Sequence, residues 1–180
     1  MSLKDKIISN LFPKEKGYVK HKSDRGKATK YGITLATAMA HGYVGDMKQL
    51  SISKAYEIYI TTYWDANSLD DILKISEKVA EEVFDTGVNM GVKIAGGFLQ
   101  RALNVFNRNE KDYFDLKRDG IVGNRTIEAL EFYFKRNPKY AEQNLLKALN
   151  GMQTERYIVI AENDTSQEDF TNGWIRERVT

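Results

Sequence analysis

The sequence contains no cysteine, and this absence excludes disulfide bridges and thiolate metal ligands. Histidine is almost absent as well. The two that occur, His21 and His41, do not have the close spacing of a helical zinc site. Asp115 and Asp119 resemble the start of a calcium loop, but Lys117 and Thr126 stand where oxygen ligands are required. We therefore expect no metal ion and no cofactor.

Long apolar runs are missing too, so no stable membrane insertion is expected. The first 12 residues include Lys4, Asp5 and Lys6 and lack the continuous apolar core of a signal peptide. These features predict a soluble protein that is synthesised in the cytoplasm.

Neither sign of charge dominates, because 27 Lys and Arg residues are interleaved with 25 Asp and Glu residues. Nucleic-acid-binding proteins usually concentrate their basic residues on one face, so no nucleic acid partner is expected. Hydrophobic residues make up 42% of the 180-residue chain and charged residues 29%, which is typical of a globular protein. This length suits one compact domain, or one domain with a small module.

The hydrophobic pattern that is present is overwhelmingly helical and predicts a mainly α fold. Leu3, Ile7, Ile8 and Leu11 form one helical stripe, which Pro13 ends. Further helices are expected over 34–40, 51–63, 76–90, 94–106 and 124–135, then from Asn137-Pro138 onwards, with a last helix carrying Phe170 and Trp174. Residues 17–33 lack a stripe and predict an irregular loop or small β-hairpin, and Tyr113-Phe114 suggests another short hairpin.

Three residues near the N-terminus form a pattern suited to cleaving a sugar chain. Asp24 and Thr29 follow Glu15 after nine and fourteen residues, among glycines that permit tight turns. Glycoside hydrolysis needs a carboxylic acid that protonates the leaving oxygen, and an opposing group that activates water or stabilises the developing charge.

The segments Glu15-Lys16-Gly17-Tyr18 and Thr29-Lys30-Tyr31-Gly32-Ile33-Thr34 resemble the signature of glycoside hydrolase family 108. This family contains phage-type N-acetylmuramidases, some of which were first labelled secretion activator proteins. Lys16 departs from the pattern, which has glycine there, and Lys27 replaces the second glycine after the aspartate. Further pieces follow in the family's order: Tyr63-Trp64-Asp65, Phe84-Asp85-Thr86-Gly87-Val88-Asn89-Met90-Gly91, Gln100-Arg101-Ala102-Leu103-Asn104, Asp119-Gly120-Ile121-Val122-Gly123 and Gly173-Trp174-Ile175-Arg176.

The resemblance implies a lysozyme-like helical fold with a small loop or hairpin near the active site. It implies a muramidase region over 1–95 and a helical peptidoglycan-binding-like region over 96–180, packed into the same globule. The implied activity is cleavage of the β-1,4 bond between N-acetylmuramic acid and N-acetylglucosamine in peptidoglycan glycan strands, in the periplasm or cell wall. Inversion of stereochemistry is expected. A holin or an export system would give the protein access to the wall.

In this scheme Glu15 is the general acid, Asp24 the base or electrostatic partner, and Thr29 the residue that orients water. Asp24 can instead form a turn, and Thr29 can satisfy a loop amide. Tyr18 and Tyr31 suit either sugar stacking or the core.

Asp85 and Asn89 lie one helical turn apart, which suits either sugar binding or helix packing. Competing functions are a lytic transglycosylase, a non-catalytic peptidoglycan-binding or export-assisting secretion activator, and a helical interaction protein.

Overall fold

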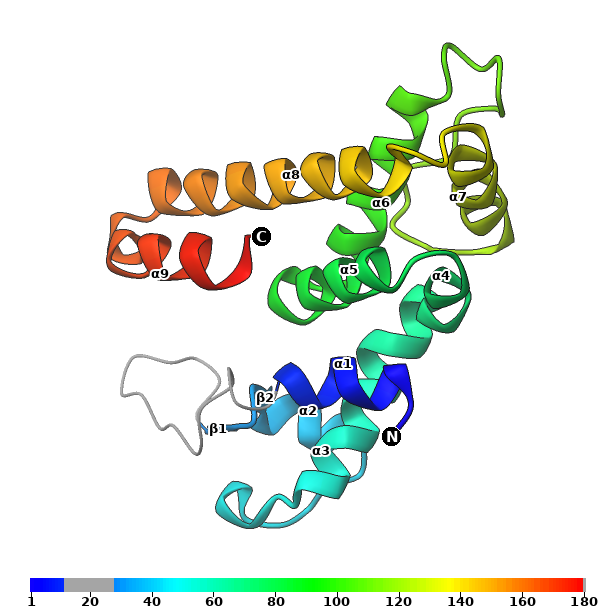
Figure 1. Cartoon of the computed structure of the whole chain (residues 1–180). Coiled ribbons are helices and arrows are strands. Elements are labelled where there is room, and N and C mark those ends of the chain that lie inside the picture. The colour runs from blue at the N-terminus through cyan, green and yellow to red at the C-terminus, as the bar shows by residue number, and fades with distance from the viewer. Residues whose placement is uncertain (12–27, 180) are drawn as a thin grey trace. The chain divides into compact units, whose positions relative to one another are not determined.

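The computed structural model describes residues 1–11 and 28–179 (Figure 1). It divides into two compact units, Met1–Asp65 and Ala66–Thr180. Helices dominate both units, which confirms the predicted mainly α fold. The predicted boundary near residue 95 differs from this division, and it stays a prediction about the family's functional regions.

The first unit contains three α-helices and the two short strands of the described chain. Its elements are α1 (Leu3–Leu11), β1 (Thr29–Lys30), β2 (Ile33–Thr34), α2 (Leu35–Ala40), the 3₁₀ turn η1 (Met47–Gln49), α3 (Ile52–Tyr59) and the π-helical turn η2 (Ile60–Trp64). The core of the unit includes Ile7, Ile8, Ile58 and Trp64, each at most 3% exposed. The hydroxyl of Tyr56 donates to the carboxylate of Asp5, so α1 and α3 are also joined by a polar contact.

Side chains cap the first turns of α2 and α3. Thr34 precedes α2 and accepts a hydrogen bond from the backbone N–H of Thr37 at 3.2 Å. Ser51 caps α3 in the same way, through the N–H of Lys54. Because each cap satisfies an otherwise unpaired amide of the first helical turn, it fixes where the helix begins.

The helix expected over 51–63 changes character at Ile60. From there the chain widens into the π-helical turn η2 and continues into the 3₁₀ turn η3 (Asp65–Asn67). The hydroxyl of Thr61 donates to the carbonyl oxygens of Glu57 and Ile58, which competes with the regular helical pattern. The wide turn accompanies the complete burial of Trp64, and π-bulges of this kind are frequent at functional sites.

The second unit is built from six α-helices: α4 (Leu69–Ile75), α5 (Glu77–Met90), α6 (Val92–Phe106), α7 (Asn124–Arg136), α8 (Ala141–Asn163) and α9 (Glu168–Arg178). The 3₁₀ turn η4 (Thr165–Gln167) reverses the chain, so that α9 folds back along the long helix α8 (Figure 1). α5 packs on α4, α6 and α8. Phe84, Leu99, Leu103, Leu130 and Leu145 are fully buried and form the centre of this core.

A close glycine contact fixes the long connection between α6 and α7. A Cβ added at Gly96 would lie 2.4 Å from the carbonyl oxygen of Gly120, and one added at Gly120 would lie 2.2 Å from that of Lys93. Gly120 also has a φ of +74°, which side-chain-bearing residues rarely adopt. The connection therefore meets α6 at a point where only glycine fits.

The hairpin expected at Tyr113-Phe114 does not form, because amide side chains of α6 take the place of a partner strand. Asn104 donates to the carbonyl of Leu116 and accepts from its N–H, both at 2.8 Å. Gln100 bonds the backbone of Gly120 and Ile121 in a similar way, and Asn107 donates to the carbonyl of Tyr113. Side chains thus satisfy much of the backbone of the connection, together with local backbone bonds such as that from the Asp119 N–H to the Lys117 carbonyl.

Two predicted helix starts are also wrong in detail. Gly123, in an extended conformation, occupies the cap position of α7, and Asn124 is already the first helical residue. Asn137 ends α7 instead of opening α8, since its N–H and its side-chain amide both donate to the carbonyl of Tyr133. The chain then makes a separate turn, and α8 begins only at Ala141.

Candidate functional site

The β-hairpin carries two of the predicted site residues. Thr29 pairs with Thr34 and Lys30 with Ile33, in antiparallel register. Tyr31 and Gly32 form the turn with φ values of 53° and 72°, as in the tight two-residue turns that join the strands of a β-hairpin. The hydroxyl of Tyr59 donates to the carbonyl of Tyr31 at 2.7 Å, which ties the turn to α3. Both Thr29 and Tyr31 are half-buried and held by regular structure.

Glu15, Tyr18 and Asp24 lie outside the described residues. Their predicted roles therefore stay predictions. Thr29 begins the hairpin that follows them in sequence, so the hairpin is the part of the predicted catalytic region that the structure describes.

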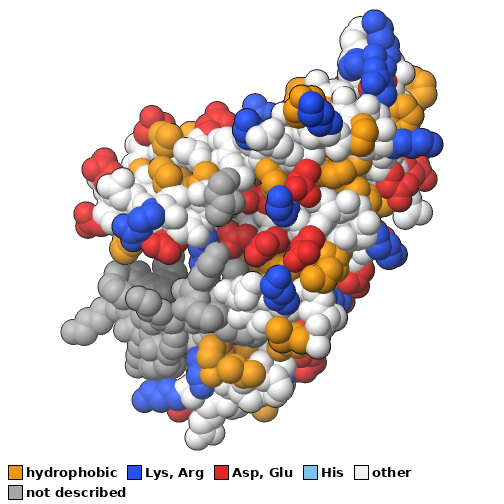
Figure 2. All heavy atoms as spheres, viewed as in Figure 1, with side chains coloured by type: hydrophobic (Ala, Val, Ile, Leu, Met, Phe, Trp, Pro, Cys, Tyr) orange, Lys and Arg blue, Asp and Glu red, His pale blue; other side chains and the backbone are white. Residues whose placement is uncertain are grey.

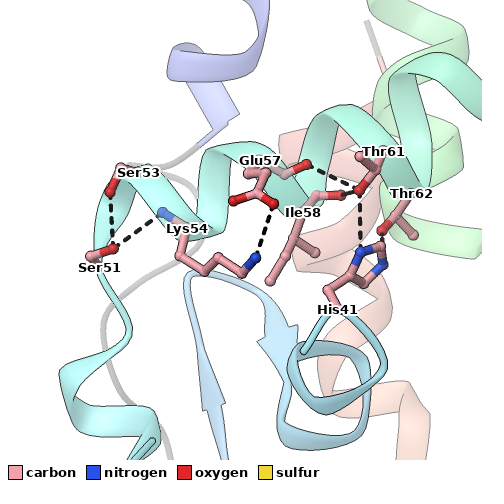
Figure 3. A network of polar contacts seen from close by, with 8 residues as sticks. All are labelled: His41, Ser51, Ser53, Lys54, Glu57, Ile58, Thr61 and Thr62. Carbon is pink, nitrogen blue, oxygen red and sulfur yellow. Dashed lines mark hydrogen bonds and ion pairs between the residues drawn. The ribbon is translucent and has the colours of Figure 1, made fainter. Parts of the chain in front are cut away.

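His41 lies in a polar network beside the π-helical turn η2 (Figure 3). Its Nδ1 is 3.3 Å from the Thr61 hydroxyl and its Nε2 is 2.9 Å from the Thr62 hydroxyl. Because the Thr61 hydroxyl donates to backbone carbonyls, it can accept from Nδ1–H, which leaves Nε2 to accept from Thr62. Both ring nitrogens are then engaged, so His41 fastens the end of α2 to η2 and is not a free base or metal ligand.

Asp85 and Asn89 share one face of α5, as the sequence predicted, and both contact the C-terminal helices. Asp85 forms an ion pair of 2.8 Å with Arg178 of α9, and both side chains are nearly buried. Asn89 donates to the hydroxyl of Tyr157 of α8 at 2.9 Å. These contacts support the helix-packing interpretation of the pair. The second Asp85 oxygen is buried and has no hydrogen-bond partner in the described part of the chain.

Glu82, on the same face of α5, was not predicted as a site residue. Burial and the nearby charge of Asp85 raise its pKa to about 7, although hydrogen bonds from Thr86 and Asn150 oppose the rise. Its carboxyl group therefore changes protonation near neutral pH. The sequence signal was present, since Glu82 stands three residues before Asp85 and faces the same side of the helix.

An open groove of about 850 Å³ lies between the α6–α7 connection and α7. Three apolar side chains on it are notably exposed: Phe114 at 82%, Ile121 at 63% and Phe132 at 41%. Asp119 and Arg125 also line it and supply polar groups. Apolar and aromatic surface with a few hydrogen-bonding groups is the usual make-up of a ligand-binding groove, and aromatic faces suit sugar rings.

Residues 1–11 and 28–179 contain no group of three or more His, Asp or Glu side chains placed to hold a metal ion. No helix there is long and apolar enough to cross a membrane. Figure 2 shows basic and acidic side chains spread together over the visible face, in keeping with the interleaved charges of the sequence.

Residues 8–91 match the model of Glycosyl hydrolase 108, and residues 94–179 match the model of a Predicted Peptidoglycan domain. These matches confirm the resemblance found in the sequence and indicate a peptidoglycan-associated function. No curated protein matches the chain. The solved structure of Brucella abortus SagA is similar, with a TM-score of 0.64 and 24% identity over 98% of this chain and 95% of that one. At this identity the likeness shows a shared fold.

Proposed function

We propose that this chain, whose residues 8–91 match the glycosyl hydrolase 108 family, is an N-acetylmuramidase. It cleaves the β-1,4 bond between N-acetylmuramic acid and N-acetylglucosamine in peptidoglycan. The single observation that carries the proposal is the family match over 8–91, because this range includes Glu15, Asp24 and Thr29, for which the sequence resemblance implies catalytic roles.

In the proposed reaction Glu15 donates its proton to the leaving glycosidic oxygen. Thr29 orients the attacking water on the opposite face of the sugar, and Asp24 acts as base or stabilises the oxocarbenium-like charge. The hairpin supports this role for Thr29, because regular pairing with Thr34 and the anchored turn at Tyr31 restrict how far the hydroxyl can move. Water held opposite the acid gives inversion at the anomeric carbon.

The C-terminal region has a separate part in the proposal. The groove at Phe114 and Phe132 lies wholly within the range matched by the Predicted Peptidoglycan domain, so we assign it to the glycan strand. A holin or an export system carries the protein to its substrate in this scheme.

The test is turnover of purified peptidoglycan by Glu15→Gln, with Glu57→Gln as the matched control. Glutamine keeps the size of the side chain but cannot donate the required proton, so turnover should fall at least about 100-fold. Glu57 is exposed and ion-paired with Lys54, so its variant should keep full activity. A Glu15→Gln protein that retains a tenth of wild-type turnover contradicts the assignment of the acid.

Analysis of the reaction products separates the competing functions. Reducing ends at N-acetylmuramic acid support hydrolysis, whereas 1,6-anhydro ends identify a lytic transglycosylase. Binding without any cleavage by the wild-type protein identifies a non-catalytic wall-binding or secretion activator protein, the alternative to which the departure at Lys16 points.

A further inference from the structure

A second, smaller depression in the C-terminal unit is lined by cations. It has a volume of about 210 Å³ and is bordered by Lys93, Arg101, Arg118 and Arg156, together with Gly97 and Phe98. We call it the basic hollow. The four cations come from α6, the α6–α7 connection and α8, so it is the fold that brings them together. No carboxylate lines the basic hollow.

In the described part of the chain, none of these four cations has an ion pair with Asp or Glu, whereas Lys54, Lys74, Lys78 and Arg108 each have one. Gathering like charges without a counter-charge destabilises the folded state. Three of the four are arginines, whose planar guanidinium groups bind carboxylate or phosphate through paired hydrogen bonds. This composition selects an anionic ligand.

Gly97 also lines the basic hollow. It lies inside α6, where glycine costs about 1 kcal/mol relative to alanine. Its neighbour Gly96 has a packing reason, since a Cβ there would strike Gly120. A Cβ at Gly97 would meet nothing within 4 Å, so packing does not require glycine. A larger side chain at Gly97 would take up space beside the basic hollow.

The basic hollow and the groove lie on either side of the segment Lys117–Asp119. Lys117 and Asp119 line the groove, whereas Arg118 between them lines the basic hollow, as expected of an extended segment whose successive side chains point to opposite sides. On α6, Gln100 faces the groove and Arg101 the basic hollow. A polymer with a neutral sugar part in the groove must therefore carry an anionic branch that extends past this segment in order to contact both depressions.

We propose that the basic hollow binds the free carboxylates of the peptidoglycan stem peptides while the groove contacts the glycan. This proposal rests on the peptidoglycan-directed function proposed above, and it names the part of the polymer that is recognised. All lining residues except Lys93 fall within the range matched by the Predicted Peptidoglycan domain.

The experiment measures binding by co-sedimentation with purified peptidoglycan, in a Glu15→Gln background that leaves the polymer intact. Three forms are compared: untreated, with carboxylates converted to neutral amides by carbodiimide and glycinamide, and stripped of phosphate-linked polymers by hydrofluoric acid. Arg101→Gln/Arg156→Gln should bind untreated peptidoglycan about tenfold more weakly. Lys135→Gln/Lys147→Gln makes the same change in net charge at exposed positions outside the basic hollow, and should bind normally.

Amidation of the peptidoglycan carboxylates should lower binding of the parent protein, Glu15→Gln, to the level of the Arg101→Gln/Arg156→Gln variant. It should not weaken binding of that variant further. Hydrofluoric acid treatment should change nothing. Gly97→Leu, which adds a side chain to the lining of the basic hollow, should also weaken binding, whereas Gly151→Leu, in a similarly open position on α8, should not.

The proposal is overturned if the Arg101→Gln/Arg156→Gln and Lys135→Gln/Lys147→Gln variants lose binding equally. It is also overturned if binding of the parent protein is insensitive to amidation. Loss only after hydrofluoric acid treatment assigns the basic hollow to a phosphate polymer instead. Failure of the parent protein to bind any form contradicts the peptidoglycan-directed function itself, whereas catalysis by Glu15 is tested separately by turnover.

Discussion

Glu82 provides a quantitative test of how burial affects the stability of the C-terminal unit. Its side chain is only 6% exposed, and burial together with the charge of Asp85 raises its pKa from the ordinary 4.5 to about 7. Glutamine in its place keeps the shape and an oxygen that accepts from Thr86, but cannot ionise. Glu82→Gln therefore removes one buried charge at neutral and alkaline pH.

The direction in which pH changes the free energy of unfolding depends on whether the folded or the unfolded protein binds a proton at Glu82. Between pH 4.5 and 7 the folded protein holds the proton and the unfolded chain does not, so the free energy of unfolding falls as pH rises. A pKa rise from 4.5 to about 7 corresponds to about 3 kcal/mol, at about 1.4 kcal/mol per pKa step. This contribution is intact below pH 4.5 and is lost as pH rises to 7 and above.

Urea unfolding followed by circular dichroism between pH 5 and 8.5 measures the effect. Glu82→Gln should lose most of this dependence on pH and should exceed the wild type by up to about 3 kcal/mol at pH 8.5, with little difference near pH 5. The control is Glu81→Gln, because Glu81 is adjacent but exposed and should behave like the wild type. Identical slopes for the wild type and Glu82→Gln would refute the reasoning.

Three further predictions concern the same unit. A fragment ending at residue 94 should not unfold cooperatively in thermal melts, because α5 would lose its packing on α6 and α8; a sharp transition would contradict this. Gly120→Ala should lower the free energy of unfolding by about 2 kcal/mol or more, since the methyl group meets the Lys93 carbonyl and φ is positive; a wild-type urea midpoint would contradict it. Gly151→Ala should raise that free energy by about 0.5–1 kcal/mol, because its Cβ meets open space in a helix; an unchanged or lower melting temperature would count against it.

The sequence predicted helices well where the helical spacing of the apolar residues and the position of a capping residue indicate the same start. The starts of α2 and α5 are examples, since helices were expected from 34 and 76, and Thr34 and Ser76 cap them. It failed where side chains compete for the same backbone groups. Asn137 resembles a cap for the following helix, but its amide bonds the preceding one, and only the three-dimensional path of the chain decides between the two.

The candidate site was predictable only in part, for a similar reason. The resemblance to a family signature predicts Glu15, Asp24 and Thr29 as site residues, because their order along the chain is the signal. The groove and the basic hollow, by contrast, gather residues up to 63 positions apart, from Lys93 to Arg156, and no local spacing reveals that proximity. The amides at Gln100, Asn104 and Asn107 were visible as a helix face, but their use as a substitute strand was not.

The contact between Gly96 and Gly120 has a consequence for sequence change over evolution. A side chain at either position would strike the backbone of the opposing segment, so a substitution at one cannot be rescued by a smaller residue at the other. Only a shift of the whole connection would relieve the clash, and that shift would move Lys117, Arg118 and Asp119 with it. Substitutions at these two glycines during evolution are therefore expected to change the groove and the basic hollow together, and never to change only one of them.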